Sequence, residues 1–376
     1  MRKLAHVERI ADIKSIPNAD KIEVATVLGW QVVIKKGEFS PGEQVVYIEI
    51  DSRVPSDNPY FSFLQDRNYK VKSIKLRKQV SQGLIVPMNL LPTGKYADGD
   101  DVTELLKIIK IEDEYKAPKI SKETQLKQRH KKLYNNKIFK RLMRLEWFRK
   151  IVFKLLIPKK KKTGWLPWVI KTDEERVQNM PWILQDKELF TVTEKLDGTS
   201  ATYTLHKEGR KWKFYVCSRN VVQDTPERKN YFVNLGNVYW EMEEKYHIKD
   251  ALKWLAEEFN AAEYVTLQGE IIGDGIQKNK YEIDGHDLYL FNLIVDDVKL
   301  PSIQSAELIK KVGMKWVPII TDEYILPDTV DELMDYSTGK ATLKPDTLRE
   351  GYVFRNYEKG ISFKCVSNEF LLKWKL

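Results

Sequence analysis

Short runs in which apolar and polar residues alternate dominate the first part of the chain and restrict its fold. The runs at residues 23–27 and 44–50 are two examples, and Pro41-Gly42 is one of the turns that separate such runs. Alternation of this kind indicates half-buried strands, and closely spaced strands favour a small β-barrel. We therefore expect residues 1–110 to form an OB-type β-barrel, which a later strand pair within residues 69–88 closes. OB barrels often bind nucleic acids, but a small barrel can equally be a spacer or a protein-docking module.

Positive charge is concentrated in one segment. Residues 116–162 hold 18 Lys and Arg against Glu123 and Glu146, a net charge of +16, whereas the whole 376-residue chain carries +9. Such a block attracts a polyanion, because each phosphate that it neutralises releases counterions. Apolar residues at helical spacing in residues 137–156 predict an amphipathic basic helix, suited to nucleic acid, an acidic membrane surface or another domain. A solvated helix pair or an unstructured linker is the alternative, and we expect residues 111–165 to form a basic helical connector.

The remainder, residues 166–376, mixes predicted strands and helices and so indicates an α+β domain with antiparallel sheets. Its predicted strands and helices are strands at 213–222, 264–273, 287–295, 350–356 and 360–367, and helices at 238–259 and 302–312.

Several classes of protein are excluded by what the sequence lacks. It has no run of 18 apolar residues that could cross a membrane, and its first residues lack the apolar core of a signal peptide. Its two cysteines, Cys217 and Cys365, cannot form a disulfide framework or a zinc site, so we expect a cytoplasmic, intracellular protein with no membrane partner. The phosphate-loop pattern GxxxxGK[ST], the pattern GxGxxG and the pattern HExxH are all absent.

The stretch TVTEKLDGTSATYTL at residues 191–205 consists of two alternating halves around Lys195-Leu196-Asp197-Gly198. The pattern predicts two strands joined as a hairpin, with Gly198 letting the chain turn. Lys195 is also a candidate nucleophile, since an unprotonated lysine amine can attack phosphorus. The pattern Lys-x-Asp-Gly is weak by itself, because about 0.1 chance matches are expected in a chain of this composition.

The order of the motifs that follow is more specific. After Lys195 come CSRN at 217–220, LQGEIIG at 267–273, LYLFNLIV at 288–295, EGYVFR at 350–355 and SFKCVS at 362–367. This succession resembles the covalent nucleotidyltransferases, which include ATP-dependent ligases and RNA-capping guanylyltransferases, over most of residues 170–376.

Three further stretches resemble RNA ligases in particular. GEIIGDGIQKNKY and KTDEERVQN are similar to RNA ligase motifs, and IPNADKIEVATVLGWQVVIKKGEFSPGEQVVYIEIDS is similar to the OB module of the fifth RNA ligase family. The resemblance implies an ATP-dependent RNA ligase whose residues 166–376 form an ATP-grasp-like nucleotidyltransferase domain. It further implies that Lys195 attacks the α-phosphorus of ATP, that the AMP passes to a 5′-phosphate end, and that a 3′-hydroxyl displaces it.

Other roles also come from the resemblance. Asp197, Glu270 and Glu350 would surround Mg²⁺ or Mn²⁺, Asp197 acting through water, because such ions usually keep several waters. The nucleotide would be bound by four residues: Glu194 on the adenine side, Phe291 stacked on adenine, Arg219 at the ribose or a nucleic-acid phosphate, and Arg176 at the triphosphate. Tyr289 competes with Phe291 for the stacking role. Lys364 would stabilise charge on the α-phosphate. Taken singly, each of these residues has an ordinary structural explanation, such as a turn, a strand surface or a core aromatic.

The sequence departs from the family pattern at two points. Asn292 stands where many relatives have aspartate, and Val366 stands where many ligases have a second lysine, for which Lys373 is a candidate replacement. We expect a monomeric ligase for RNA repair that binds ATP and RNA, the latter as a nicked duplex or an RNA–DNA hybrid. A DNA ligase or capping-type enzyme is disfavoured by the missing C-terminal OB domain. A non-catalytic RNA-binding protein with a relic transferase domain is the other alternative.

Overall fold

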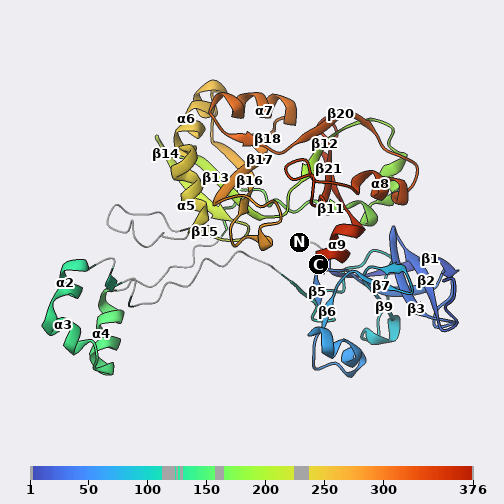
Figure 1. Ribbon diagram of the computed structural model, residues 1–376. Coiled ribbons are helices and arrows are strands. Elements are labelled where there is room, and N and C mark those ends of the chain that lie inside the picture. The colour runs from blue at the N-terminus through green and yellow to red at the C-terminus, as the bar shows by residue number, and fades with distance from the viewer. Residues whose placement is uncertain are drawn as a thin grey trace. The chain divides into compact units, whose positions relative to one another are not determined.

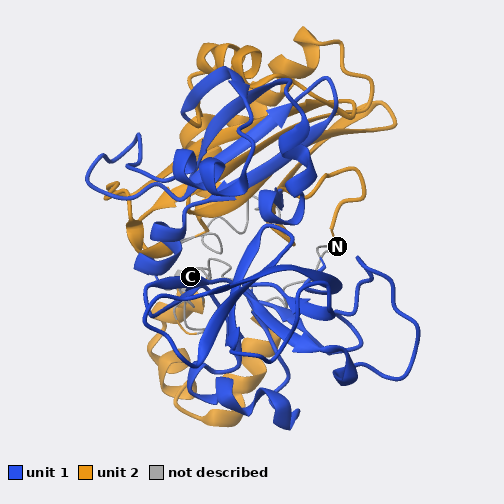
Figure 2. Cartoon of the chain, turned by 90° about the vertical axis from the view of Figure 1, so that its right-hand side faces the viewer, with its two compact units in different colours: residues 1–113, 173–196, 318–376 blue, residues 114–172, 197–317 orange. Residues whose placement is uncertain are grey.

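The computed structural model divides into two compact units, which Figure 2 distinguishes by colour. Unit 1 comprises residues 1–113, 173–196 and 318–376, and unit 2 comprises residues 114–172 and 197–317. The structure describes residues 3–111, 123, 126–127, 130–156, 165–223 and 237–374. Among these residues, no helix has both the length and the apolar character of a membrane span.

The N-terminal module of unit 1 is built on a five-stranded antiparallel sheet with the order β3-β2-β1-β4-β9. The 11-residue β1 pairs with β4 through its first half and with β2 through its second half, and its register shifts between Ile10 and Asp12. A bulge of this kind bends a strand, which lets β1 take part in both halves of a curled sheet. The elements of this module are β1 (Ala5–Ser15), β2 (Ile22–Val27), β3 (Trp30–Lys35), β4 (Gln44–Ile48), β5 (Ser52–Arg53), η1 (Pro59–Arg67), β6 (Lys70–Val71), β7 (Ile74–Leu76), β8 (Gln79–Ser81), β9 (Leu84–Pro87), η2 (Met88–Leu90) and β10 (Ile109–Lys110).

A second five-stranded sheet of unit 1 has the order β11-β22-β21-β12-β20. Aromatic and aliphatic side chains that include Phe190, Phe354 and Phe363 are fully buried in its core. The elements of this part are β11 (Glu175–Arg176), η3 (Val177–Asn179), η4 (Pro181–Gln185), β12 (Leu189–Lys195), β20 (Ile319–Ile325), α8 (Val330–Ser337), β21 (Gly351–Asn356), β22 (Ile361–Val366) and α9 (Asn368–Trp374).

The two parts of unit 1 are joined by a close backbone contact. The Gly29 amide donates to the Gln178 carbonyl at 2.8 Å, and a Cβ on Gly29 would lie only 2.9 Å from the Gln178 Cα. Val366 and Leu371, from the C-terminal elements, belong to a core cluster of the N-terminal module. The module is therefore packed into unit 1 rather than attached to it by a linker alone.

Unit 2 contains a larger sheet with the order β15-β14-β13-β16-β17-β18, and β19 pairs with β17. Helices α5, α6 and α7 pack on this sheet and share one apolar core with it (Figure 1). The predicted helix at 238–259 is two helices, because the chain adopts a left-handed conformation at His247, with φ 49°. The elements are β13 (Thr199–Glu208), β14 (Lys211–Ser218), β15 (Val222–Gln223), α5 (Val238–Tyr246), α6 (Ile248–Glu258), β16 (Tyr264–Gly273), η6 (Gln277–Asn279), β17 (His286–Val295), β18 (Val298–Lys299), α7 (Ser302–Lys311) and β19 (Lys315–Trp316).

The hairpin predicted at residues 191–205 is wrong. Its halves do form strands, β12 and β13, but they belong to different sheets. β12 lies in the sheet β11-β22-β21-β12-β20 of unit 1, and β13 lies in the large sheet of unit 2. Gly198 is not in the left-handed region; instead, a Cβ there would lie 2.3 Å from the Ile271 carbonyl oxygen. Glycine is needed for close packing against β16 rather than for a turn.

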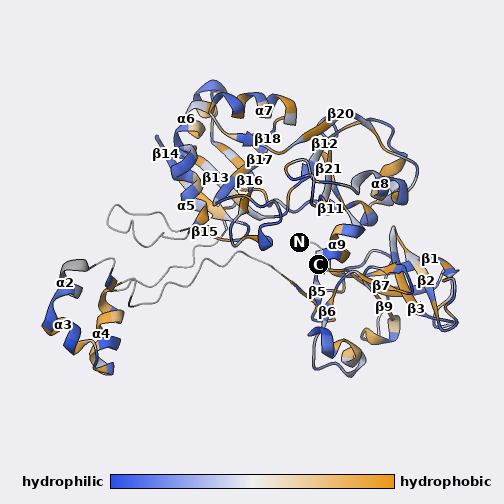
Figure 3. Cartoon of the chain, in the orientation of Figure 1, coloured by the Kyte–Doolittle hydropathy of each residue, from blue (hydrophilic) through white to orange (hydrophobic). Residues whose placement is uncertain are grey.

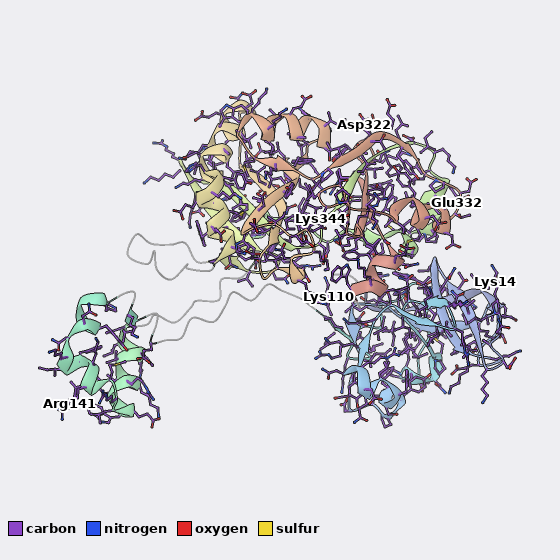
Figure 4. The ribbon with its side chains drawn as sticks, in the orientation of Figure 1. Lys14, Lys110, Arg141, Asp322, Glu332 and Lys344 are labelled. Carbon is purple, nitrogen blue, oxygen red and sulfur yellow. The ribbon has the colours of Figure 1, made fainter. Side chains whose placement is uncertain are left out.

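The described part of the basic segment includes the short helices α2 (Lys131–Asn135), α3 (Lys137–Leu142) and α4 (Glu146–Leu156). The single helix predicted at 137–156 is thus two helices, which pack on a small core that includes Met143 and Val152. Figure 3 shows hydrophobic and hydrophilic residues alternating along them, and Arg141 points away from α3 in Figure 4. The lysine run at 159–162 lies outside the described residues.

Candidate functional site

Lys195 is the last residue of β12, and its side chain is 26% exposed. Its Nζ donates to the Glu350 Oε2 at 2.7 Å. The pairing follows from the sheet register, because Lys195 lies opposite Gly351, the residue after Glu350. Gly351 has φ 157°, and a Cβ there would lie 2.0 Å from the Cys365 carbonyl oxygen. The Glu-Gly dipeptide therefore allows close strand packing and presents the glutamate to the lysine.

The Glu194 carboxylate does not share the Lys195 face of the strand. Successive side chains of a strand point to opposite faces, and Glu194 lies opposite Tyr352, which belongs to the apolar core. Glu194 is 1% exposed, and its oxygens accept from the Thr342 amide at 2.9 and 3.2 Å. Burial raises the pKa of Glu194, while the Thr342 hydrogen bond and the Arg349 charge oppose the rise.

Lys364 and Arg176 lie side by side, since they are register partners on the parallel strands β22 and β11. Lys364 also lies opposite Val353, which in turn lies opposite Thr193, so both cations are on the Lys195 face. The register thus brings three predicted site residues of unit 1 to one face of one sheet.

Arg176 is 4% exposed, and only part of its guanidinium is hydrogen-bonded. Its Nη2 donates to the Asp51 Oδ2 at 2.9 Å, and its Cζ lies 5.7 Å from the centre of the Trp30 ring. Its Nε and Nη1 are buried and have no hydrogen-bond partner in the described part of the chain. Buried donors without partners are rare in proteins, so this arginine is suited to an anionic ligand.

Arg355 is a fourth cation on this face that the sequence interpretation missed. It lies opposite Thr191, and its Nη1 donates to the Thr193 Oγ1 at 2.9 Å. Its Nη2 lies 3.5 Å from the Glu174 Oε1. Strand alternation from Lys195 to Thr191 could have suggested its face, but only together with the strand pairing.

In unit 2, Asp197 forms an ion pair with Lys280, whose side chain is 2% exposed. The Asp197 amide also donates to the Tyr281 hydroxyl at 2.9 Å. Lys280 and Tyr281 belong to the RNA ligase-like stretch GEIIGDGIQKNKY, but nothing in the sequence indicated that they contact Asp197.

Glu270 lies on β16 between Ser200 of β13 and Tyr289 of β17. Its Oε1 accepts a hydrogen bond from the Gly198 amide at 3.1 Å. Glu270 is therefore bound by the backbone of Gly198, the residue that follows Asp197.

Phe291 lies at a bulge in β17, where the register shifts opposite Gln268 and Gly269. The core residues of this strand are Leu288, Leu290, Leu293 and Val295. Because the spacing from Leu290 to Leu293 is three residues instead of two, Phe291 and Asn292 both lie off the core face. Asn292 donates to the Gln268 Oε1 at 2.8 Å, whereas Phe291 is half-buried.

Tyr289, the alternative to Phe291, and Lys373, the candidate replacement for a second lysine, have other contacts. The Tyr289 ring lies 5.5 Å from the Lys315 Nζ, in a cation–π contact. Lys373 lies on α9 with its Nζ 5.4 Å from the Trp374 ring, so it is not on the strand of Lys364. Arg219 is half-buried between β14 and β15 of unit 2.

The three candidate metal-binding carboxylates are divided between the units, with Glu350 in unit 1 and Asp197 and Glu270 in unit 2. Within the described ranges, no group of three or more His, Cys, Asp and Glu side chains is arranged to hold a metal ion. The metal site stays a prediction.

Comparisons with known proteins assign both parts of the chain. An OB-fold domain model matches residues 4–88, and an RNA ligase model matches residues 188–375. The N-terminal module is an OB-fold domain, and the C-terminal part is a mixed α/β domain, as predicted. No curated protein sequence matches the chain.

Solved structures of Naegleria gruberi RNA ligase resemble the whole chain. The structure of that ligase with PPi has a TM-score of 0.75 and 31% sequence identity, covering 100% of this chain and 99% of the other. A variant with ATP and Mn gives 0.75 and 31%, covering 100% and 98%, and another variant with AMP and Mn gives 0.74 and 30%, covering 98% and 98%. With this similarity along the whole chain and the matching family model, the chain belongs to the RNA ligase family.

Proposed function

We propose that the protein is an ATP-dependent RNA ligase of the fifth RNA ligase family, which joins 3′-hydroxyl and 5′-phosphate ends. The Naegleria ligase has been solved with ATP and Mn and with AMP and Mn, which supports ATP and a divalent metal ion as requirements here. A role in RNA repair follows from this reaction, since breaks with such ends are its substrates.

The observation that carries the proposal is the amine of Lys195, partly exposed at the end of a strand and held 2.7 Å from the Glu350 carboxylate. In the first step, the unprotonated Nζ forms a bond to the α-phosphorus of ATP, and the bond to pyrophosphate breaks. A proton leaves the nitrogen for solvent, and lysyl-adenylate results. Glu350 orients the amine through its hydrogen bond.

The next two steps transfer the AMP. A 5′-phosphate oxygen of RNA displaces Lys195 from phosphorus, which leaves an adenylylated 5′ end. A 3′-hydroxyl then attacks the 5′-phosphorus, so that a phosphodiester bond forms, AMP departs and the hydroxyl proton is released.

The cationic face around Lys195 is suited to the phosphates of ATP. Arg176, with two buried donors unpaired in the described residues, would bind the triphosphate, and Lys364 beside it would stabilise charge on the α-phosphate. On unit 2, Phe291 would stack on adenine and Arg219 would contact the ribose or a nucleic-acid phosphate. Glu194 would act on the adenine side from the opposite face of β12, where its carboxylate accepts from the Thr342 amide.

The donor set fits a hard divalent cation. Asp197, Glu270 and Glu350 offer carboxylate oxygens, the ligands that Mg²⁺ and Mn²⁺ prefer. When bound, the ion would supply positive charge beside the reacting phosphate. Lys280 and the Gly198 amide would keep Asp197 and Glu270 oriented, as they do through their present contacts.

We propose three parts in the chain: an OB module at residues 1–110, a basic connector at 111–165 and the nucleotidyltransferase domain at 166–376. The protein would act inside the cell as a monomer, on RNA in a nicked duplex or an RNA–DNA hybrid. Because 116–162 carries a net charge of +16, its deletion should weaken sealing at fixed salt more than self-adenylylation. Equal losses would instead make the segment part of the catalytic fold.

The decisive experiment is incubation of the purified protein with α-labelled ATP and Mg²⁺ or Mn²⁺, followed by acid precipitation. We expect an acid-stable label that Lys195→Ala removes. Absence of label from the unaltered protein would rule out the ligase mechanism, whereas label on the Lys195→Ala variant would rule out only this nucleophile.

A further inference from the structure

The OB module contains a long stretch without acidic residues. Between Asp66 and Asp98 there is no Asp or Glu, but there are seven Lys and Arg. Six of the seven fall within residues 67–78, which cover the end of η1 and the strands β6 and β7. This cluster of positive charge lies outside the basic connector and matches no motif described above.

Four of these cations converge on one pocket of about 440 Å³. The end of η1 supplies one, β6 and its following loop supply two, and β7 supplies the fourth. The lining residues are Arg67, Lys70, Lys72, Ser73, Ile74, Lys75 and, from helix α9, Leu372. The pocket therefore combines a cationic wall with two apolar side chains.

The lining of this pocket carries positive charge and no carboxylate. Within the described part of the chain, Arg67, Lys70 and Lys75 form no ion pair. Arg67 and Lys75 are exposed, and Lys70 and Lys72 are half-buried. Like charges gathered in this way repel each other, and an anionic ligand relieves the repulsion.

The spacing of the cations favours a polymer over a small anion. Lys70 and Lys75 are five residues apart in a largely extended segment, which corresponds to a span of up to about 16 Å. A single phosphate cannot contact cations spread over such a length, but a phosphodiester backbone can. Flexible lysines on strands also suit a backbone that is bound without base reading.

We propose that this pocket, the OB phosphate pocket, binds the phosphodiester backbone of the RNA substrate, with Ile74 and Leu372 against ribose or base. The inference rests on the proposed function for the identity of the nucleic acid. It assigns the OB module a contact with RNA that is separate from the Lys195 face.

The test is RNA binding without ATP, so that no chemical step is needed. A 5′-fluorescein-labelled single-stranded RNA is titrated by anisotropy with the full-length protein at several KCl concentrations. For Lys70→Gln/Lys72→Gln/Lys75→Gln we expect about 10- to 100-fold weaker binding near 100 mM KCl, and a salt slope smaller by about 2 to 3. The matched control, Lys14→Gln/Lys21→Gln/Lys36→Gln, neutralises three exposed lysines of the same module that do not line the pocket, of which Lys14 points outward in Figure 4. It should bind RNA within about twofold of the unaltered protein.

Equal affinities and slopes for the pocket variant and the control would overturn the proposal. Thermal melting checks that the variants fold, and Lys70→Arg/Lys72→Arg/Lys75→Arg keeps the charge if the glutamine variant does not fold. We expect the arginine variant to retain RNA affinity, and its loss would contradict a charge-based site. Displacement of RNA by pyrophosphate with the unaltered protein but not with the glutamine variant would instead make this a small-phosphate site. If RNA binding behaves as expected while no Lys195 label forms, the pocket stands and the ligase mechanism fails.

Discussion

Lys195 and Asp197 lie only two residues apart in the sequence, and each forms a lysine–carboxylate pair with a distant residue. The lysines of the two pairs differ in exposure. The Lys195 side chain is 26% exposed beside a Glu350 that is 12% exposed, whereas the Lys280 side chain is 2% exposed beside an Asp197 that is 12% exposed. A nucleophile must reach its substrate, so the first pair is suited to chemistry. The buried lysine of the second pair is suited to holding Asp197 in place.

A lysine–carboxylate pair can thus either present a nucleophile or hold a carboxylate in place, and the exposure of the lysine distinguishes the two roles. Removing the partner of a partly exposed cation is expected to cost less stability than removing that of a fully buried cation, because water screens the exposed charge. Activity and stability should therefore respond in opposite order at the two sites.

The largest expected effect is on labelling by ATP. Lys195→Arg keeps the positive charge but cannot lose its proton, so we expect covalent AMP to fall by at least about 1,000-fold. Lys280→Arg keeps a cation beside Asp197 and should retain at least about a tenth of the labelling rate. Rapid-quench measurement of acid-stable label checks both, with the exposed Lys187→Arg as control. Equal losses at Lys195 and Lys280 would remove the distinction between the pairs.

Replacing a carboxylate should separate the pairs further. Glu350→Gln keeps the size of the side chain but removes the charge that faces Lys195, and we expect label formation to slow by about 100-fold. Chemical denaturation should show a change of less than about 1 kcal/mol, because the pair is partly exposed. The idea fails if stability drops while the labelling rate is unchanged.

Stability should show the reverse order for the lysines. Lys280→Met leaves Asp197 without its cation, and we expect the free energy of unfolding to fall by about 2 to 3 kcal/mol. Lys195→Met should lower it by a smaller amount, because the Lys195 side chain is 26% exposed whereas that of Lys280 is 2% exposed. Urea unfolding at pH 7 measures both values, and a smaller loss at Lys280 than at Lys195 would contradict the assignment.

The smallest effect concerns Glu194, a buried carboxylate whose oxygens accept from the Thr342 amide. Burial raises its pKa in the folded protein, so ionisation costs stability as the pH rises above the unfolded value of about 4.5. Relative to Glu194→Gln, the unaltered protein should therefore lose stability between pH 4 and pH 7. Urea midpoints across this range test the sign, and a constant difference would show that Glu194 is not perturbed.

The strands of the catalytic part could be predicted from sequence because they are long and have regular patterns. The predicted strand at 264–273 coincides with β16 at Tyr264–Gly273, and the predicted helix at 302–312 with α7 at Ser302–Lys311. The break at His247 was not predictable, since the apolar periodicity continues across it and a single left-handed residue leaves no strong signal.

Sheet membership and long-range contacts could not be predicted. Alternation shows that residues 191–195 and 199–205 form strands, but not that they join different sheets. The Arg176–Asp51 contact joins residues 125 positions apart, and the partners of Lys280 and Arg355 also depend on the tertiary fold. The order of the motifs indicates the candidate residues, whereas the surroundings of each residue depend on the tertiary fold.

The two cysteines have a practical consequence. Cys217 and Cys365 are both fully buried, and burial raises the pKa of each thiol to about 12. Thiolates are the reactive form, so neither should take up a maleimide dye in the folded protein at neutral pH. A cysteine introduced at an exposed position of each unit, such as Lys14 and Lys253, could thus carry a fluorophore pair without removal of native thiols. Energy transfer between the dyes would then report, in real time, whether the distance between the two labelled positions changes when ATP and RNA are added.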